Sequence, residues 1–141
     1  MVQFTLGGHH GTLLTSKHEN SVAYDTNLGY IAGTKPPCKV LIIVDAISRK
    51  YFTGETSWLW DINFDLLNQD HVQKIILCGK YVNDLAMRFD YTAIPPEKIA
   101  CYDTVPQAAE ALKADGNAAL YVITCFSDRD KLLTLVQKEE G

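Results

Sequence analysis

The chain has 141 residues, of which 47% are apolar and 21% charged, and its formal net charge is -4. This length fits one domain with a substantial core, so we expect a single domain over residues 1–141. The acidic balance, without a basic stripe, argues against nucleic acid as a partner. No apolar run approaches the roughly 18 residues that a membrane span needs. The start, MVQFTLGGHHG, lacks the pattern of a signal peptide, so we expect a cytoplasmic protein.

The first third of the chain predicts a lead-in followed by a helix. Residues 1–16 contain two glycine-centred breaks between short extended runs, which indicates an irregular segment or a loose hairpin. The stretch ENSVAYDTNLGYIAG (19–33) is compatible with a helix whose inward side chains are Val22, Ala23, Leu28 and Ile31.

Four short apolar runs are typical of strands buried on both faces of a sheet. They are CKVLIIVDA (38–46), KIILCG (74–79), KIACYD (98–103) and ALYVITC (119–125).

Helical patterns separate or follow these strands, over residues 83–91, 104–116 and 127–138. The second of these helices has Thr104 as its expected N-cap, with Gln107 three residues later, and it ends at Gly116. Alternating strands and helices indicate βαβ units with right-handed crossovers. We therefore expect an α/β protein: a three-layer Rossmann-like domain with a mainly parallel sheet.

The four cysteines, Cys38, Cys78, Cys101 and Cys125, form no CxxC pair. Each lies in or beside an apolar run, so we interpret them as buried, reduced thiols. Their spacing does not favour a zinc site, and we predict no metal site.

Phosphate-binding motifs are weak in this chain. The tripeptide GTK (33–35) is followed by two prolines and does not open a helix, so it is no Walker A motif. Gly79 and Lys80 are better placed, between a strand end and a helix start, where ligands gather in open parallel sheets. This turn supports one hypothesis: a small Rossmann-like domain that binds a nucleotide or acidic metabolite. The alternative is a tight turn with a solvated lysine.

No complete catalytic apparatus is visible in the sequence. His9 and His10 are adjacent, but no third metal ligand lies at a useful spacing, and a surface pair is the preferred interpretation. The other two histidines are His18 and His71. Cys78 lies at the end of a predicted strand and before a helix, a position that suits a nucleophile, although a packed cysteine is the default interpretation.

The stretch TGETSWLWD (53–61) places Trp58 and Trp60 between Glu55 and Asp61, shortly after Tyr51 and Phe52. Large aromatic residues dominate protein interfaces, and a carboxylate can orient a histidine or pair with an arginine. Two interpretations stay open. Either the stretch meets a partner, or it is buried and Asp61 caps a helix over INFDLL (62–67).

At these residues the chain resembles a known family. ISRKYFTGETSWLWDINFDLL, followed by KIILCGKYVNDLAMRFDY, is similar to the C-terminal domain of MurT-type Mur ligase-like proteins. The upstream SKHENSVAYDTNLGYI resembles the opening of that domain, with His18 where asparagine is usual. The resemblance covers roughly residues 15 to 136.

The resemblance implies a docking role. MurT pairs with GatD, a class I glutamine amidotransferase with a Cys-His site, and together they amidate the D-glutamate of lipid II in peptidoglycan precursors. Ammonia from GatD attacks an acyl phosphate that MurT makes with ATP. The MurT C-terminal domain docks GatD and is thought to lend it a carboxylate, here Asp61 or Glu55. Tyr51, Phe52, Trp58 and Trp60 would contact the partner, and Lys80 and Lys17 would face substrate or nucleotide.

The chain departs from a whole MurT in lacking the P-loop and the zinc-ribbon cysteines of the central domain. We therefore expect an excised or naturally separate domain that needs no cofactor of its own. ATP and magnesium are expected only with the central domain, and this chain alone should neither hydrolyse ATP nor form an amide.

Overall fold

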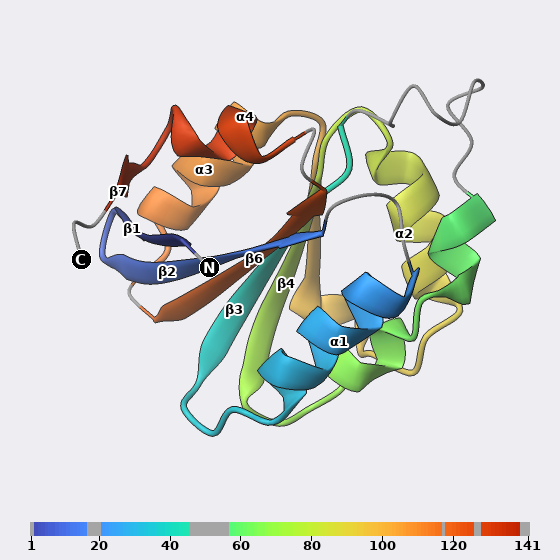
Figure 1. Cartoon of the computed structure of the whole chain (residues 1–141). Coiled ribbons are helices and arrows are strands. Elements are labelled where there is room, and N and C mark those ends of the chain that lie inside the picture. The colour runs from blue at the N-terminus through green and yellow to red at the C-terminus, as the bar shows by residue number, and fades with distance from the viewer. Residues whose placement is uncertain (1, 17–20, 46–56, 117, 126–127, 139–141) are drawn as a thin grey trace.

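The computed structural model describes residues 2–16, 21–45, 57–116, 118–125 and 128–138. Seven strands form one sheet in the order β5-β4-β3-β6-β2-β1-β7, with helices on both faces (Figure 1). The strands are β1 (Val2–Leu6), β2 (His9–Ser16), β3 (Cys38–Ile43), β4 (Val72–Cys78), β5 (Ile99–Tyr102), β6 (Ala119–Cys125) and β7 (Gln137–Lys138). The predicted three-layer α/β domain with a mainly parallel sheet is confirmed.

The helical elements alternate with the strands along most of the chain. The α-helices are α1 (Ser21–Ala32), α2 (Val82–Asp90), α3 (Val105–Lys113) and α4 (Arg129–Leu133). Three short 3-10 helices, η1 (Ser57–Asp61), η2 (Phe64–Leu67) and η3 (Pro96–Lys98), complete the set. No helix among the described residues has the length and apolar character that crossing a membrane would require.

Strand β3 lies at the centre of the parallel sheet, between β4 and β6. All six of its residues are buried. Val40 and Ile42 face one core while Leu41 and Ile43 face the other, as the period of two in a strand requires. The strand order reverses beside β3, since the chain proceeds to β4 on one side and returns with β6 on the other. Such a reversal is where open α/β sheets usually bind ligands.

The lead-in over residues 1–16 is a hairpin that belongs to the sheet. Strands β1 and β2 pair antiparallel, and β2 continues the parallel sheet by pairing with β6. Gly11 faces Phe4 across this hairpin, and the Phe4 ring occupies the space that a side chain at Gly11 would need.

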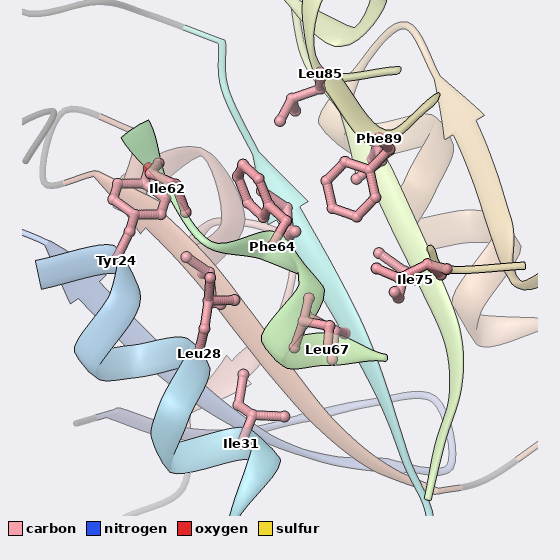
Figure 2. Close-up of a cluster of buried hydrophobic side chains, with 14 of the residues drawn as sticks. Tyr24, Leu28, Ile31, Ile62, Phe64, Leu67, Ile75, Leu85 and Phe89 are labelled. Atoms are coloured by element: carbon pink, nitrogen blue, oxygen red, sulfur yellow. The ribbon is translucent and has the colours of Figure 1, made fainter. Parts of the chain in front are cut away.

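One core lies between the sheet and the helices α1 and α2 (Figure 2). The inward side chains of α1 are Tyr24, Leu28 and Ile31, at the spacing of one helix face. Phe64 of η2 is packed against Phe89 of α2, with 4.7 Å between the ring centroids. Val22, which we predicted to point inward, is 71% exposed, because the buried face of α1 passes through Tyr24 instead.

The second core lies under α3 and α4 on the opposite face. Thr104 and Gln107 form the predicted capping box of α3, in which each side chain bonds the other residue's backbone N–H. The predicted helix over 127–138 is wrong in its second half. Helix α4 ends at Leu133, and Gln137–Lys138 pairs with β1 as strand β7, because the outer edge of β1 offers unpaired backbone groups.

Two other sequence predictions differ from the structure. Strand β5 is not buried on both faces: it is the edge strand, and none of its four residues is fully buried. The helix predicted over 62–67 is the short helix η2, whose N-cap is Asn63, so Asp61 does not cap it.

A buried polar cluster lies at the amino ends of the parallel strands. His9 and Lys39 are both buried, which contradicts the interpretation of His9 and His10 as a surface pair; only His10 is exposed. The Nδ1 atom of His9 lies 3.2 Å from the Leu6 carbonyl, which can only accept, so Nδ1 carries the proton. The Nε2 atom then accepts from the Lys39 Nζ atom at 3.1 Å. Lys39 also pairs with Asp115 at 3.4 Å.

We predict that Gly11→Ala destabilises the protein, whereas Gly29→Ala does not. A Cβ atom at Gly11 would lie 2.2 Å from the Phe4 ring, so the hairpin must shift, at a cost of about 2 kcal/mol. A Cβ atom at Gly29, in α1, meets nothing within 4 Å and should stabilise the helix by about 0.5–1 kcal/mol. Urea unfolding of the two variants measures the difference. Equal free energies of unfolding would contradict the packing of Phe4 on Gly11.

We predict that His9 makes the protein less stable in mild acid. Burial lowers the pKa of His9 below its ordinary value of 6.5, and the Lys39 ammonium lowers it further. The neutral form is therefore favoured by folding. Its contribution is complete above about pH 6.5, the pKa in the unfolded chain, and is lost as the pH falls towards the folded pKa.

The measurement is the free energy of unfolding of His9→Gln and of the parent between pH 7.5 and 5.5. The loss of stability over this range should be smaller in His9→Gln than in the parent. His10→Gln, at the exposed neighbour, should keep the parent's pH dependence. Identical profiles for all three proteins would sink the prediction.

Candidate functional site

The predicted site residues lie partly outside the described part of the chain. Lys17, Tyr51, Phe52 and Glu55 belong to the undescribed segments, as do His18 and the side chain of Trp58. The described part of the site begins at Ser57 with helix η1. It continues through η2 to the helix α2, which packs beside η1.

Helix η1 has a buried side and an exposed side. Leu59 is buried in the core, and so is Ile62, which comes directly after the helix. Trp60 and Asp61 are exposed. Trp60 is 47% exposed, an unusual position for a residue that gains so much from burial. The interpretation in which the stretch TSWLWD is wholly buried is therefore wrong for Trp60 and Asp61.

Arg88 of α2 holds η1 in place. Its Nε atom donates to the Leu59 carbonyl at 3.1 Å, and its Nη2 atom donates to the Ile62 carbonyl at 2.7 Å. The Leu59 carbonyl also accepts from the Ile62 backbone N–H at 3.3 Å, and the Ile62 carbonyl also accepts from the Phe64 backbone N–H at 3.1 Å, so the guanidinium adds a second hydrogen bond to each. The same guanidinium lies 5.5 Å from the ring centroids of both Trp60 and Phe64, within the range of cation–π attraction.

An aromatic patch surrounds this clamp, and we define it as Trp60, Met87 and Tyr91. The Trp60 and Tyr91 rings meet edge to face with centroids 5.1 Å apart. Met87 and Tyr91 lie four residues apart at the end of α2, so they share one face. All three side chains are exposed. A contiguous patch of this kind on a surface usually marks a site of interaction.

Asp61 differs from the other two carboxylates near η1 and η2. Asp25 accepts a hydrogen bond from the Asn63 backbone at 2.7 Å, and Asp65 accepts one from the Ala93 backbone at 2.8 Å. Both therefore have structural roles. The Asp61 carboxylate forms no hydrogen bond or ion pair with the residues that the structure describes, and it stands in solvent beside Trp60.

The Gly79-Lys80 turn is already occupied by a protein carboxylate. Gly79 has φ +113°, and a Cβ atom there would lie 2.5 Å from the Val44 carbonyl oxygen, so the position requires glycine. The Lys80 backbone N–H, which a phosphate would use, donates to Asp45 Oδ1 at 2.7 Å. A carboxylate in that place disfavours a phosphate at this turn, although the Lys80 side chain is exposed.

Asp45 belongs to a network at the carboxyl ends of β3 and β6 that sequence reasoning missed. The Lys131 ammonium bonds Asp45 and lies 3.3 Å from Asp128, and Asp128 accepts from the Asp45 backbone N–H at 3.0 Å. Burial opposes ionisation of Asp45, but the bonds from Lys131 and Lys80 outweigh it and lower its pKa. Asp45 follows a buried strand directly, which is the signal that could have found it.

Cys78 is not a nucleophile in this structure. It is fully buried, and burial together with the nearby Asp45 and Asp128 raises its pKa to about 12, so the thiol stays protonated. Burial likewise raises the pKa of Cys38 to about 11. The prediction of buried thiols is wrong for Cys101, which is exposed on the edge strand β5. The described cysteines Cys38, Cys78 and Cys101 are free thiols.

Within the described ranges, no three His, Cys, Asp or Glu side chains come together in a way that could hold a metal ion.

Arg88 is the residue of the candidate site that a reader of the sequence could have identified. The family pattern includes an arginine in this helix, but only the folded chain places it against η1.

Comparison with known proteins identifies the family. A sequence model described as the MurT ligase C-terminal family matches residues 18–128, which is most of the chain. No curated protein matches the chain. Among solved structures, it is similar to a domain from Haemophilus ducreyi 35000HP described as a UDP-N-acetylmuramate:L-alanyl-gamma-D-glutamyl-meso-diaminopimelate ligase. That similarity has a TM-score of 0.49 and 12% identity over 95% of this chain and 96% of the other. The family match extends from before α1 to the start of α4 and includes the whole of η1 and α2, and the chain therefore belongs to the MurT ligase C-terminal family.

Proposed function

We propose that this chain is the C-terminal domain of the ligase subunit of a lipid II isoglutaminyl synthase. In this function it docks a GatD-type class I glutamine amidotransferase in the cytoplasm and lends that partner a carboxylate. The observation that carries the proposal is the pair Trp60 and Asp61, both exposed on a helix to which Arg88 donates two hydrogen bonds. Membership of the MurT ligase C-terminal family supports it.

The proposed chemistry uses a carboxylate beside the Cys-His pair of the glutaminase. A Cys-His pair hydrolyses glutamine through a thiolate, and the imidazole that takes the thiol proton becomes charged. A carboxylate bonded to the other ring nitrogen holds the tautomer and stabilises that charge. Asp61 suits this role, because it bonds no other described residue and because its exposed, short side chain is attached to helix η1. Glu55 is the second candidate.

We expect the remaining steps to take place outside this domain. The ammonia that glutamine releases would displace phosphate from an acyl phosphate formed on the α-carboxylate of the D-glutamate, forming the amide of D-isoglutamine. ATP and magnesium would serve that activation in a central domain. Within the described residues, Cys78 is protonated and the Lys80 N–H is bonded to Asp45. We therefore expect the chain alone to have no ligase or ATPase activity.

We predict that Trp60→Ala weakens binding to the glutaminase. Exposed tryptophans at the centre of an interface commonly contribute enough for about a tenfold loss of affinity or more on truncation to alanine. Tyr30→Ala is a matched control, because Tyr30 is 49% exposed on α1, away from the aromatic patch. Binding is measured by calorimetry with the purified glutaminase. Equal affinity of both variants would remove the aromatic patch from the interface.

We predict that replacing the candidate carboxylates slows glutamine hydrolysis without breaking the complex. Asp61→Asn and Glu55→Gln keep the side-chain shape and remove the charge. One of the two carboxylates is expected to orient the histidine. The variant that lacks it should lower the glutaminase rate of the complex by about a hundredfold or more. Asp65→Asn is the control, since Asp65 bonds the backbone of Ala93. An unchanged rate in the double variant Glu55→Gln with Asp61→Asn would refute the carboxylate role.

A further inference from the structure

Strand β5 presents a free edge to solvent. It pairs with β4 on one side, and on the other side no strand of the described residues covers it. Natural edge strands are usually protected by charged residues, proline or a bulge. The sequence of β5, IACY, has no charge and no proline, and its pairing with β4 runs without a bulge. Its backbone can therefore pair with a further strand.

A groove lies beside this edge on the face that α1 and α2 cover. It has a volume of about 400 Å³ and is lined by Ala86 and Phe89 of α2, residues 92–96, Ile99 and Cys101. Most of this lining is apolar, and Phe89 joins the groove to the core beneath.

A second groove lies beside the same edge on the α3 face. Its volume is about 580 Å³, and it is lined by Cys101, Tyr102, Pro106, Gln107 and Glu110, with Asp103. Both grooves therefore meet at Cys101, the exposed residue of β5. Because successive side chains of a strand point to opposite faces, a strand added to β5 would place alternate side chains in the two grooves.

We infer that an extended segment of the partner glutaminase adds to β5 as a further parallel or antiparallel strand, with basic side chains between apolar ones. The inference rests on the proposed function and names how the partner binds. It adds the edge strand to the aromatic patch as a second part of the same interface.

Charge decides between this occupant and a second copy of the chain. The charged residues that line the grooves are all acidic: Asp90 in the first, and Asp103 and Glu110 in the second. Lys113, which pairs with Glu110 at 3.2 Å, lines neither groove. Two copies joined through β5 would bring these carboxylates together, whereas a basic segment would neutralise them.

The edge is continuous with the aromatic patch through α2. Ala86, Phe89 and Asp90 line the first groove, while Met87 and Tyr91 on the same helix form part of the aromatic patch. A partner that covers Trp60 therefore reaches the free edge of the sheet without leaving α2.

Hydrogen exchange and thiol labelling of the chain, alone and with the glutaminase, test the inference. In the complex, the exchange rates of the Ile99–Tyr102 amides should fall by about tenfold or more, because new strand pairing protects them. Labelling of Cys101 by an uncharged thiol reagent should slow by a similar factor. Cys101→Ser measures the background from the other thiols. A complex that leaves both rates unchanged overturns the inference while the proposed function stands.

Charge reversal tests the stated chemistry of the partner segment. Asp90→Lys with Asp103→Lys should weaken binding by about fivefold or more at low salt, and by less at high salt. Asp70→Lys with Asp130→Lys, at exposed positions that line neither groove, should leave the affinity unchanged. An equal effect of both pairs overturns the inference. Failure to form any complex refutes the proposed function as well, and a dimer of the chain that protects Ile99–Tyr102 favours self-pairing instead.

Discussion

Burial of both faces of β3 is the constraint on which the rest of the structure depends. All six of its residues are buried, and its side chains alternate between the two cores. A strand of this kind needs neighbours on both sides and helices above and below. Strands β4 and β6 supply the neighbours, and the helices on each face follow from the crossovers between them. The carboxyl end of β3 is consequently fixed, and Asp45 is fixed with it.

Arg88 is the second constraint, and it concerns the candidate site directly. Helix η1 has only five residues, and Arg88 adds a side-chain hydrogen bond to each of the carbonyls of Leu59 and Ile62. With Leu59 buried and the backbone held, Trp60 and Asp61 have no room in the core and remain exposed. The exposure of a large aromatic residue is therefore a consequence of how the helix is attached. Trp60 and Asp61 therefore form a part of the surface whose backbone Arg88 holds.

The polar groups at the carboxyl edge of the sheet satisfy one another. The Lys131 ammonium bonds the Asp45 carboxylate, and the Asp128 carboxylate accepts from the Asp45 backbone N–H. The Asp45 carboxylate also accepts from the Lys80 backbone N–H, in the turn before α2. These bonds join the ends of β3, β4 and β6 and stabilise the edge, since buried charges need partners. They also occupy the donors that a phosphate would require.

Local patterns in the sequence determined much of the fold. The apolar runs predicted β3, β4 and β6, because strands buried on both faces require continuous apolar residues. Thr104 and Gln107 predicted the start of α3, because a capping box involves only residues three apart. The aromatic stretch ending at Asp61 pointed to the candidate site. The sequence by itself could not show which of its side chains are exposed.

Tertiary structure alone decided the features that join distant residues. Arg88 lies 29 residues from Leu59 in the chain, and Lys131 lies 86 residues from Asp45. Strand β7 formed where a helix was expected, because the edge of β1 lies beside it. Strand β5 has the composition of a buried strand but lies at the edge of the sheet that the described residues form. Sequence periodicity reports how residues within one element are arranged, whereas pairing and exposure depend on which elements meet in space.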